Sequence, residues 1–299
     1  MDSDELVQEA AGTAYSILLS SNTNKLKPHI PDIIKMSKVT FQKIGPIYLN
    51  ILNDITSLLI RSGEEIISNL TLIEDFVNCI MLKLEEKIEA KQFENVTYLL
   101  EIITNIIEAN GYNISHFIPY LIDLSLVVLQ IFLEKNNFNH ELRSDLITKS
   151  LNLISVAYNN FSSIMLEYTN KKIIKDTLIK VLGINQNYIR HFVIAVIGEI
   201  TQADSSIFIF SIKNIMPILI NCLEYDESKD INNFHKLCIC NNTCWTIGIL
   251  AITYSKTMFE YVNETIKRII KILVWSTVNI FFFILFYLLF LLFYFILIS

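Results

Sequence analysis

Apolar residues recur along most of this chain at steps of three or four, the spacing that gathers side chains on one face of an α-helix. The segment 188–200 shows the pattern plainly, and its apolar face is made of Ile189, Val193, Val196, Ile197 and Ile200. Short polar breaks, such as 203–206, separate one run from the next. We therefore expect amphipathic helices that each bury one face against a neighbour.

These runs predict helical hairpins, each with two helices and a polar break between them. The expected helix pairs are 5–19 with 28–39, 47–60 with 69–83, 96–109 with 118–134, 142–158 with 163–182, 188–200 with 209–223, and 237–254 with 260–275. The pairs recur every ~40–47 residues, the period of HEAT repeats, which stack because one hairpin cannot bury its apolar face alone. The predicted fold class is all-α: an α-solenoid of about six HEAT-type hairpins over 1–277, followed by an apolar helix over 278–299.

The last segment, 278–299, has no charged residue and is long enough, at about 20 apolar residues, to cross a bilayer. Lys267, Arg268 and Lys271 precede it, as basic residues flank a membrane span on its cytoplasmic side. Two interpretations stay open. The segment is either a C-terminal anchor or translated intron sequence, since its Phe, Leu, Ile, Tyr and Asn are what thymine- and adenine-rich DNA encodes; we favour the second.

Composition supports helices and narrows the class of partner. Only 7 Gly and 5 Pro occur, which leaves little material for tight turns or Gly-rich phosphate loops. The net charge of −6 comes from scattered acidic residues, so the chain lacks the basic patch that nucleic acid requires and suits basic peptides better. The N-terminus does not resemble a signal peptide, and the 5 Cys form no even framework. We expect free thiols and a location in the cytoplasm and nucleus.

No pattern in the chain predicts catalysis, a cofactor or a metal. The His residues are scattered, and neither GxxxxGK[ST] nor GxGxxG occurs, so we expect no enzyme and no cofactor. Cys238, Cys240 and Cys244 beside His235 resemble a zinc-ligand cluster. However, Cys238 and Cys240 point to nearly opposite sides of one helix, which excludes a shared tetrahedral site.

Leu237, Asn241, Trp245 and Gly248 follow one another at steps of three or four, so they share one face of a helix. An indole and an amide on the same face can line an open surface of a helical stack. A Trp at this spacing can equally be a core residue that stabilises its own hairpin.

The segment 240–248, Cys-Asn-Asn-Thr-Cys-Trp-Thr-Ile-Gly, resembles the C-terminal half of transportin-type receptors of the importin-beta (karyopherin-beta) family. Gly-Glu-Ile-Thr at 198–201 and Met-Pro-Ile-Leu at 216–219 precede it, as in that family. Three further segments resemble other transportin repeats in the same order: 7–11, 98–101 and 117–120. The resemblance covers roughly 5–277 and is weaker between about 136 and 182.

The resemblance implies a nuclear import receptor that binds nuclear localisation signals of cargo proteins on a concave HEAT surface. It implies that Trp245, Asn241 and Leu237 hold the proline-tyrosine part of such a signal, the indole on apolar groups and the amide on the peptide backbone. Glu199 matches an acidic residue that contacts basic cargo side chains, although a solvated helix-end carboxylate is an ordinary alternative. The small GTPase Ran and nucleoporins are the other partners implied for the full-length family.

Several departures from the family change these expectations. The segments that match other acidic cargo positions carry Ser20, Ser21, Asn53, Asn152 and Asn159 instead, which lowers the charge available for a basic signal. The N-terminal repeats that bind Ran and the acidic loop that couples the two sites have no counterpart in this chain, so we expect Ran-gated transport to fail. Two other classes stay open: a HEAT scaffold for a folded partner, and a tail-anchored membrane adaptor, which requires 278–299 to be translated.

Overall fold

The computed structural model describes residues 10–11, 13–14, 17–18, 23–41, 70–134, 139–224 and 234–275. Every regular element within these ranges is a helix and none is a strand, so the predicted all-α solenoid class is confirmed. The predicted helix 47–60, the apolar segment 278–299 and the predicted domain boundary at 277 lie outside the described residues.

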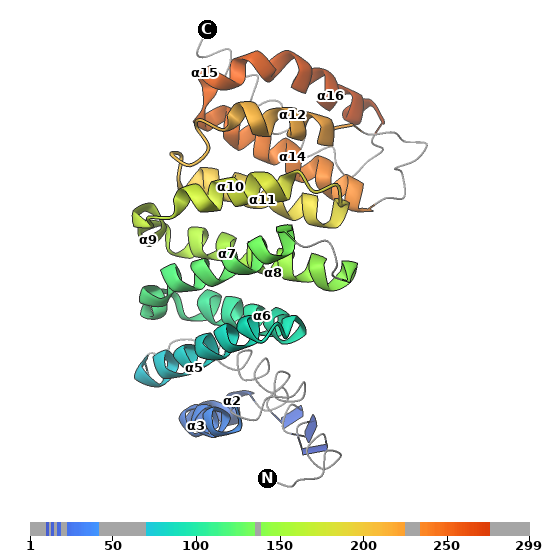
Figure 1. The fold of residues 1–299 in the computed structure, drawn as a ribbon. Coiled ribbons are helices and arrows are strands. Elements are labelled where there is room, and N and C mark those ends of the chain that lie inside the picture. Colours follow the sequence, from blue (N-terminus) through green and yellow to red (C-terminus); the bar gives the residue numbers. More distant parts are fainter. Residues whose placement is uncertain are drawn as a thin grey trace. The chain divides into compact units, whose positions relative to one another are not determined.

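Figure 1 shows the helices as coiled ribbons, coloured in chain order. The first elements are α2 (Thr23–Leu26), η1 (Lys27–His29), α3 (Ile30–Phe41), α5 (Leu70–Glu89), α6 (Phe93–Asn110), η3 (Gly111–Phe117), α7 (Ile118–Glu134) and α8 (His140–Asn160). The remaining ones are α9 (Ser162–Glu167), α10 (Lys171–Leu182), α11 (Asn187–Ala203), α12 (Ile212–Cys222), α14 (Phe234–Thr253), α15 (Ser255–Met258), η4 (Phe259–Tyr261) and α16 (Val262–Trp275).

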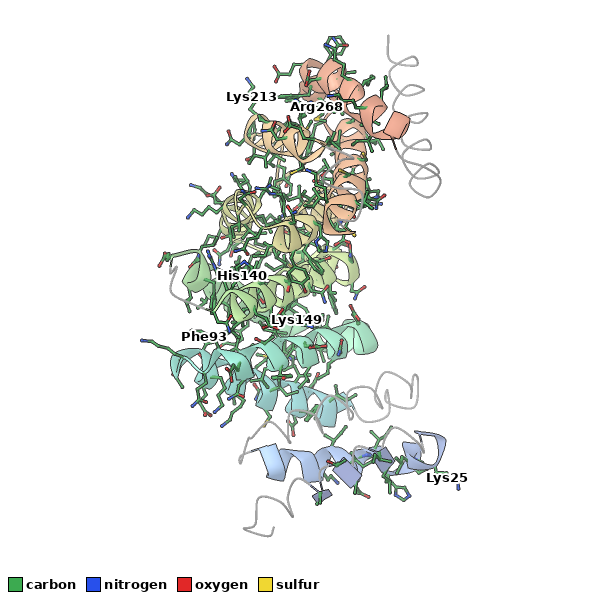
Figure 2. All side chains as sticks on the ribbon, turned by 90° about the vertical axis from the view of Figure 1, so that its right-hand side faces the viewer. Lys25, Phe93, His140, Lys149, Lys213 and Arg268 are labelled. Atoms are coloured by element: carbon green, nitrogen blue, oxygen red, sulfur yellow. The ribbon has the colours of Figure 1, made fainter. Side chains whose placement is uncertain are left out.

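The chain divides into two compact units, 1–128 with 139–164 and 129–138 with 165–299. In the first unit α5 packs on α3 and α6, and α6 packs on α8. Phe76, Ile80 and Leu84 of α5 follow one another at steps of four and are buried, whereas Cys79 is half-buried. Lys149 of α8, labelled in Figure 2, forms an ion pair of 2.9 Å with Glu101 of α6. Apolar burial therefore holds these helices together, with polar links at their exposed sides.

One stretch among the described residues, 114–134, is long and apolar enough to span a membrane by length and composition. Half of its most apolar window, 50%, is buried inside the protein. A core helix of a soluble protein passes the same test, so this stretch is weak support for a membrane span.

The second unit has two layers of helices. One layer holds α10, α12 and α16, the other holds α11 and α14, and the layers meet where α10 packs on α11 and α12 on α14. The whole predicted face of α11 is buried, which confirms the periodicity reading. Three hydrogen bonds link the α11 side to the α14 side in the same order along both, at separations of 51, 52 and 49 residues, so α11 and α14 run parallel.

The helix pairing differs from the expected one in both units. In the first unit the sequence paired 96–109 with 118–134, yet α6 packs mainly on α5 and α8. In the second unit it paired 188–200 with 209–223, yet α11 packs mainly on α10 and α14, and α12 packs on α14. For α10 and α11 the short connection 183–186 explains the pairing, whereas 204–211 is a longer crossing from α11 to α12. The hairpins are therefore α10 with α11 and α12 with α14.

Candidate functional site

The predicted binding residues lie on two neighbouring helices of the second unit. Glu199 is on α11, and Leu237, Asn241 and Trp245 are on α14. Asn241 is exposed and the other three are half-buried, in helices whose remaining faces pack on each other and on α10 and α12. These residues are therefore at least partly accessible to solvent, and we call the surface that they form the α11–α14 face.

Trp245 rests on the backbone of α11 at Gly198. A Cβ atom added to Gly198 would lie 2.3 Å from Cζ3 and 2.9 Å from Cε3 of the indole. Real side-chain atoms do not approach so closely, so only glycine admits the six-membered ring at this point. The indole is consequently part core and part surface, which combines the two interpretations that the sequence left open.

Two side chains on α14 fix how this helix is turned toward α11. Asn242 Nδ2 donates to the carbonyl oxygen of His191 at 2.8 Å, and buried Thr246 Oγ1 donates to that of Ile194 at 2.8 Å. Each follows directly after a predicted binding residue, Asn241 or Trp245, and lies about 100° further around the helix. The two hydrogen bonds therefore hold Asn241 and Trp245 in place on the α11–α14 face.

An aromatic cluster on the first turns of α11 was missed by the sequence reasoning. The ring centroid of Tyr188 lies 5.6 Å from that of Phe192 and 5.8 Å from that of His191, both edge to face, and His191 and Phe192 are 4.4 Å apart. Tyr188 is 37% exposed. The available signal was three aromatic rings at steps of three and four, a spacing that brings them together.

The cysteines near this face are buried thiols for the most part. Cys222, Cys240 and Cys244 are buried, Cys238 is half-buried, and the Cys240 thiol donates to the Cys222 carbonyl oxygen at 3.6 Å. Burial raises the pKa of the Cys222 and Cys244 thiols above the usual range, so both stay protonated and unreactive. Within the described ranges no group of three or more His, Cys, Asp or Glu side chains could hold a metal ion.

The positions that the resemblance aligns with acidic cargo residues are described only in part. Asn152 and Asn159 are exposed on α8, while Ser20, Ser21 and Asn53 lie outside the described residues. Where they are described, these positions offer neutral amides to a ligand rather than carboxylates.

Comparison with known proteins identifies the fold and goes no further. No protein-family model matches the chain, and no curated protein matches it in sequence. Among solved structures it is similar to importin beta, in "Crystal Structure of Importin Beta in a Polyethylene Glycol Condition", with a TM-score of 0.61 and 12% sequence identity. That match covers 91% of this chain but 34% of importin beta, so the chain spans about a third of the length of its structural neighbour. The likeness supports a karyopherin-like HEAT fold and does not single out transportin.

Proposed function

We propose that this chain is the cargo-binding part of a nuclear import receptor of the transportin type, and that it binds an extended localisation signal along the α11–α14 face. The observation that carries the proposal is the half-exposed Trp245 indole seated on Gly198, beside exposed Asn241, in a fold like that of importin beta. A rigidly seated aromatic ring next to a free amide is suited to a peptide, because it offers apolar area and backbone hydrogen bonds together.

Each site residue has a distinct part in the proposed complex. Trp245 and Leu237 contact apolar side chains of the signal, including its proline-tyrosine pair. Asn241 pairs with the extended peptide backbone, since its amide both donates and accepts. Glu199, half-buried one residue after Gly198, attracts a basic side chain of the signal. The chain acts as a binding protein, and none of these roles involves catalysis.

The wider partners belong to the same proposal. Ran and nucleoporins would act on a full-length receptor, of which this chain corresponds to one part, and the receptor would move between cytoplasm and nucleus. A HEAT scaffold for a folded partner is the alternative, and the two differ in their response to an isolated signal peptide.

Fluorescence anisotropy with a labelled proline-tyrosine signal peptide tests the proposal on the full chain in mild detergent. We expect saturable binding that weakens by about tenfold or more for Trp245→Ala, as at aromatic hot spots. Because Trp245 also packs on α11, Asn241→Ala provides a second variant at an exposed position, with an expected loss of about fivefold.

Phe210→Ala is the matched control, since Phe210 is 93% exposed and lies in the connection 204–211 rather than on the α11–α14 face. It should leave the affinity unchanged. A chain that ignores the peptide, or one in which Phe210→Ala weakens binding as much as Asn241→Ala does, would favour the scaffold instead.

A further inference from the structure

Three turns of the second unit present apolar side chains to solvent: the first is 165–170, the second 204–211 and the third 254–261. Leu166 is 50% exposed, Phe210 is 93% exposed and Phe259 is 72% exposed, and Ile209 beside Phe210 is 43% exposed. Each turn leads into a helix of the same layer, namely α10, α12 or α16. We call the surface formed by these side chains and the nearby Lys172, Lys213 and Lys256 the turn edge.

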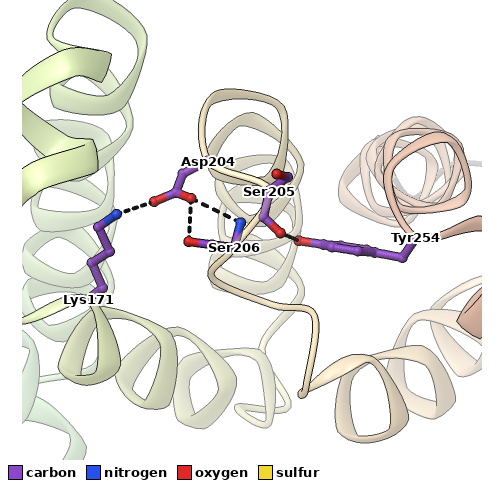
Figure 3. Close-up of polar contacts among 5 residues, drawn as sticks. All are labelled: Lys171, Asp204, Ser205, Ser206 and Tyr254. Atoms are coloured by element: carbon purple, nitrogen blue, oxygen red, sulfur yellow. Dashed lines mark hydrogen bonds and ion pairs between the residues drawn. The ribbon is translucent and has the colours of Figure 1, made fainter.

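Polar contacts fasten these turns to one another. Lys171, just after the first turn, pairs with Asp204 in the second at 2.7 Å. Tyr254, at the start of the third, donates its hydroxyl to the carbonyl oxygen of Ser205 at 2.7 Å. Asp204 also accepts from the backbone N–H and hydroxyl of Ser206 at 3.0 and 2.6 Å, and Figure 3 shows the whole set. The second turn is thus held from both sides, and the turns form one edge of the unit.

In each turn a buried apolar residue directly precedes an exposed apolar residue. Buried Met165 precedes exposed Leu166, buried Phe208 precedes exposed Ile209, and buried Met258 precedes exposed Phe259. The buried member closes the end of the helix layers by removing apolar area from water. The exposed residue does not contribute to that core, and Phe210, at 93% exposed, is the most exposed of these side chains. Folding alone therefore gives no reason for apolar side chains at the outer position.

The charge of the turn edge differs from that of the chain. One exposed lysine lies in or just after each turn, Lys172, Lys213 or Lys256, and two exposed carboxylates accompany them, Glu167 and Glu260. Since Lys171 and Asp204 neutralise each other, the edge has a net charge of plus one on a chain whose net charge is −6. The exposed apolar side chains are therefore accompanied by a small excess of positive charge on an otherwise acidic protein.

We propose that the turn edge docks on an anionic lipid membrane surface, with Leu166, Phe210 and Phe259 entering the headgroup region and the lysines facing lipid phosphates. Apolar side chains combined with basic ones are the chemistry of peripheral membrane binding. Apolar side chains on three separate turns can each enter a fluid interface, whereas a small-molecule site is a concave pocket.

This contact is distinct from the α11–α14 face. Insertion of the apolar segment 278–299 into a membrane would be a different event from docking of the turn edge, so the test must report on each segment of the chain separately.

Hydrogen exchange of the full chain, with and without vesicles, measures the amide exchange rate of each segment separately. With vesicles of phosphatidylcholine and phosphatidylserine, we expect slower exchange in 204–211 and 254–261. With phosphatidylcholine vesicles alone, protection of these two segments should be much smaller. Protection confined to 278–299, or equal protection of the turns by neutral vesicles, would overturn the proposal.

Variants at exposed positions test the same contact without disturbing the core. Phe210→Ser with Phe259→Ser should abolish the protection, because the loss of buried apolar area corresponds to more than about tenfold weaker binding. Lys213→Gln with Lys256→Gln should weaken it by about fivefold per lysine. Leu82→Ser is the control, since Leu82 is 60% exposed on α5 of the other unit. An equal effect of Leu82→Ser, or no effect of the paired Phe variants, would refute docking by the turn edge.

Discussion

At the scale of single residues, the α11–α14 face depends on a glycine, Gly198, whose lack of a side chain leaves room for the Trp245 ring. Gly198 is buried, and the Trp245 ring occupies the space where a Cβ atom would stand. Helical glycine is otherwise unfavourable, by about 1 kcal/mol relative to alanine. The close packing of the indole offsets that loss and fixes the ring at a definite height on α11. A ligand therefore meets a ring whose orientation is already set, which limits the entropy lost on binding.

Gly198→Ala tests this seat. We expect it to destabilise the protein by about 1–3 kcal/mol, because the new methyl group forces Trp245 off its position, and to weaken peptide binding in parallel. Urea unfolding followed by circular dichroism gives the free energy. In a Trp245→Ala background the cost should shrink, since most of the clash is removed.

Gly183→Ala is the matched control for this substitution. At Gly183 an added Cβ would meet the Lys180 carbonyl oxygen at 3.2 Å and no side chain, so the cost should be smaller. If Gly198→Ala has the same effect with and without Trp245, the ring does not rest where we place it.

At the scale of elements, polar links fix how helices and turns are paired. Burial disfavours the charged form of Asp204, but the hydrogen bonds from Lys171 and Ser206 outweigh it and hold the pKa of this carboxyl below its ordinary value. Tyr254 shows the opposite direction, because burial raises its pKa to about 12 and keeps its hydroxyl protonated as a donor. Both groups are therefore in the form that links neighbouring turns at neutral pH.

The lowered pKa of Asp204 predicts an acid dependence of stability. A carboxyl whose pKa is lower in the folded state stabilises it above the unfolded pKa, about 3.9, and this contribution is lost as the pH falls below that value. Lys171→Met should lower stability at pH 7, since it leaves a buried carboxylate without its cation. It should also reduce the further loss on acidification, because only the hydrogen bonds from Ser206 then lower the pKa of Asp204.

Urea unfolding at a series of pH values between 2 and 7 measures both effects, with Lys213→Met as the control for removal of an exposed lysine. Parallel pH profiles for the unmodified chain and Lys171→Met would contradict the assigned role of this ion pair.

At the scale of the whole molecule, the chain behaves as an array in which each unit has its own core. Phe76 is buried in the first unit and Phe208 in the second. Arrays of repeats owe their stability to each repeat and its neighbours, so damage should stay local. We expect Phe76→Ala to accelerate hydrogen exchange chiefly in α5 and α6, and Phe208→Ala chiefly in α11, α12 and α14.

Each of these truncations should cost about 3–5 kcal/mol in its own unit. Exchange measured by mass spectrometry after brief labelling separates the units in one experiment. Loss of protection in both units from either substitution would show that the chain unfolds as one cooperative body instead.

The helical periodicity alone was sufficient for the fold class and for the buried faces of the helices, since a helix turns by a fixed angle per residue whatever it packs against. The same regularity placed Leu237, Asn241 and Trp245 on one side of α14. Their role as a binding site stays a prediction. The sequence could not give the packing of α11 on α14, because that packing is made by contacts between residues 49 to 52 apart.

Only the tertiary structure decided three features: the seat of Trp245 on Gly198, the alignment of α11 with α14, and the row of exposed apolar side chains along the turn edge. Each depends on which atoms of distant segments meet, and local periodicity contains no information about that. The sequence by itself determined which residues form helices and which face of each is apolar, because both follow from steps of three and four along the chain.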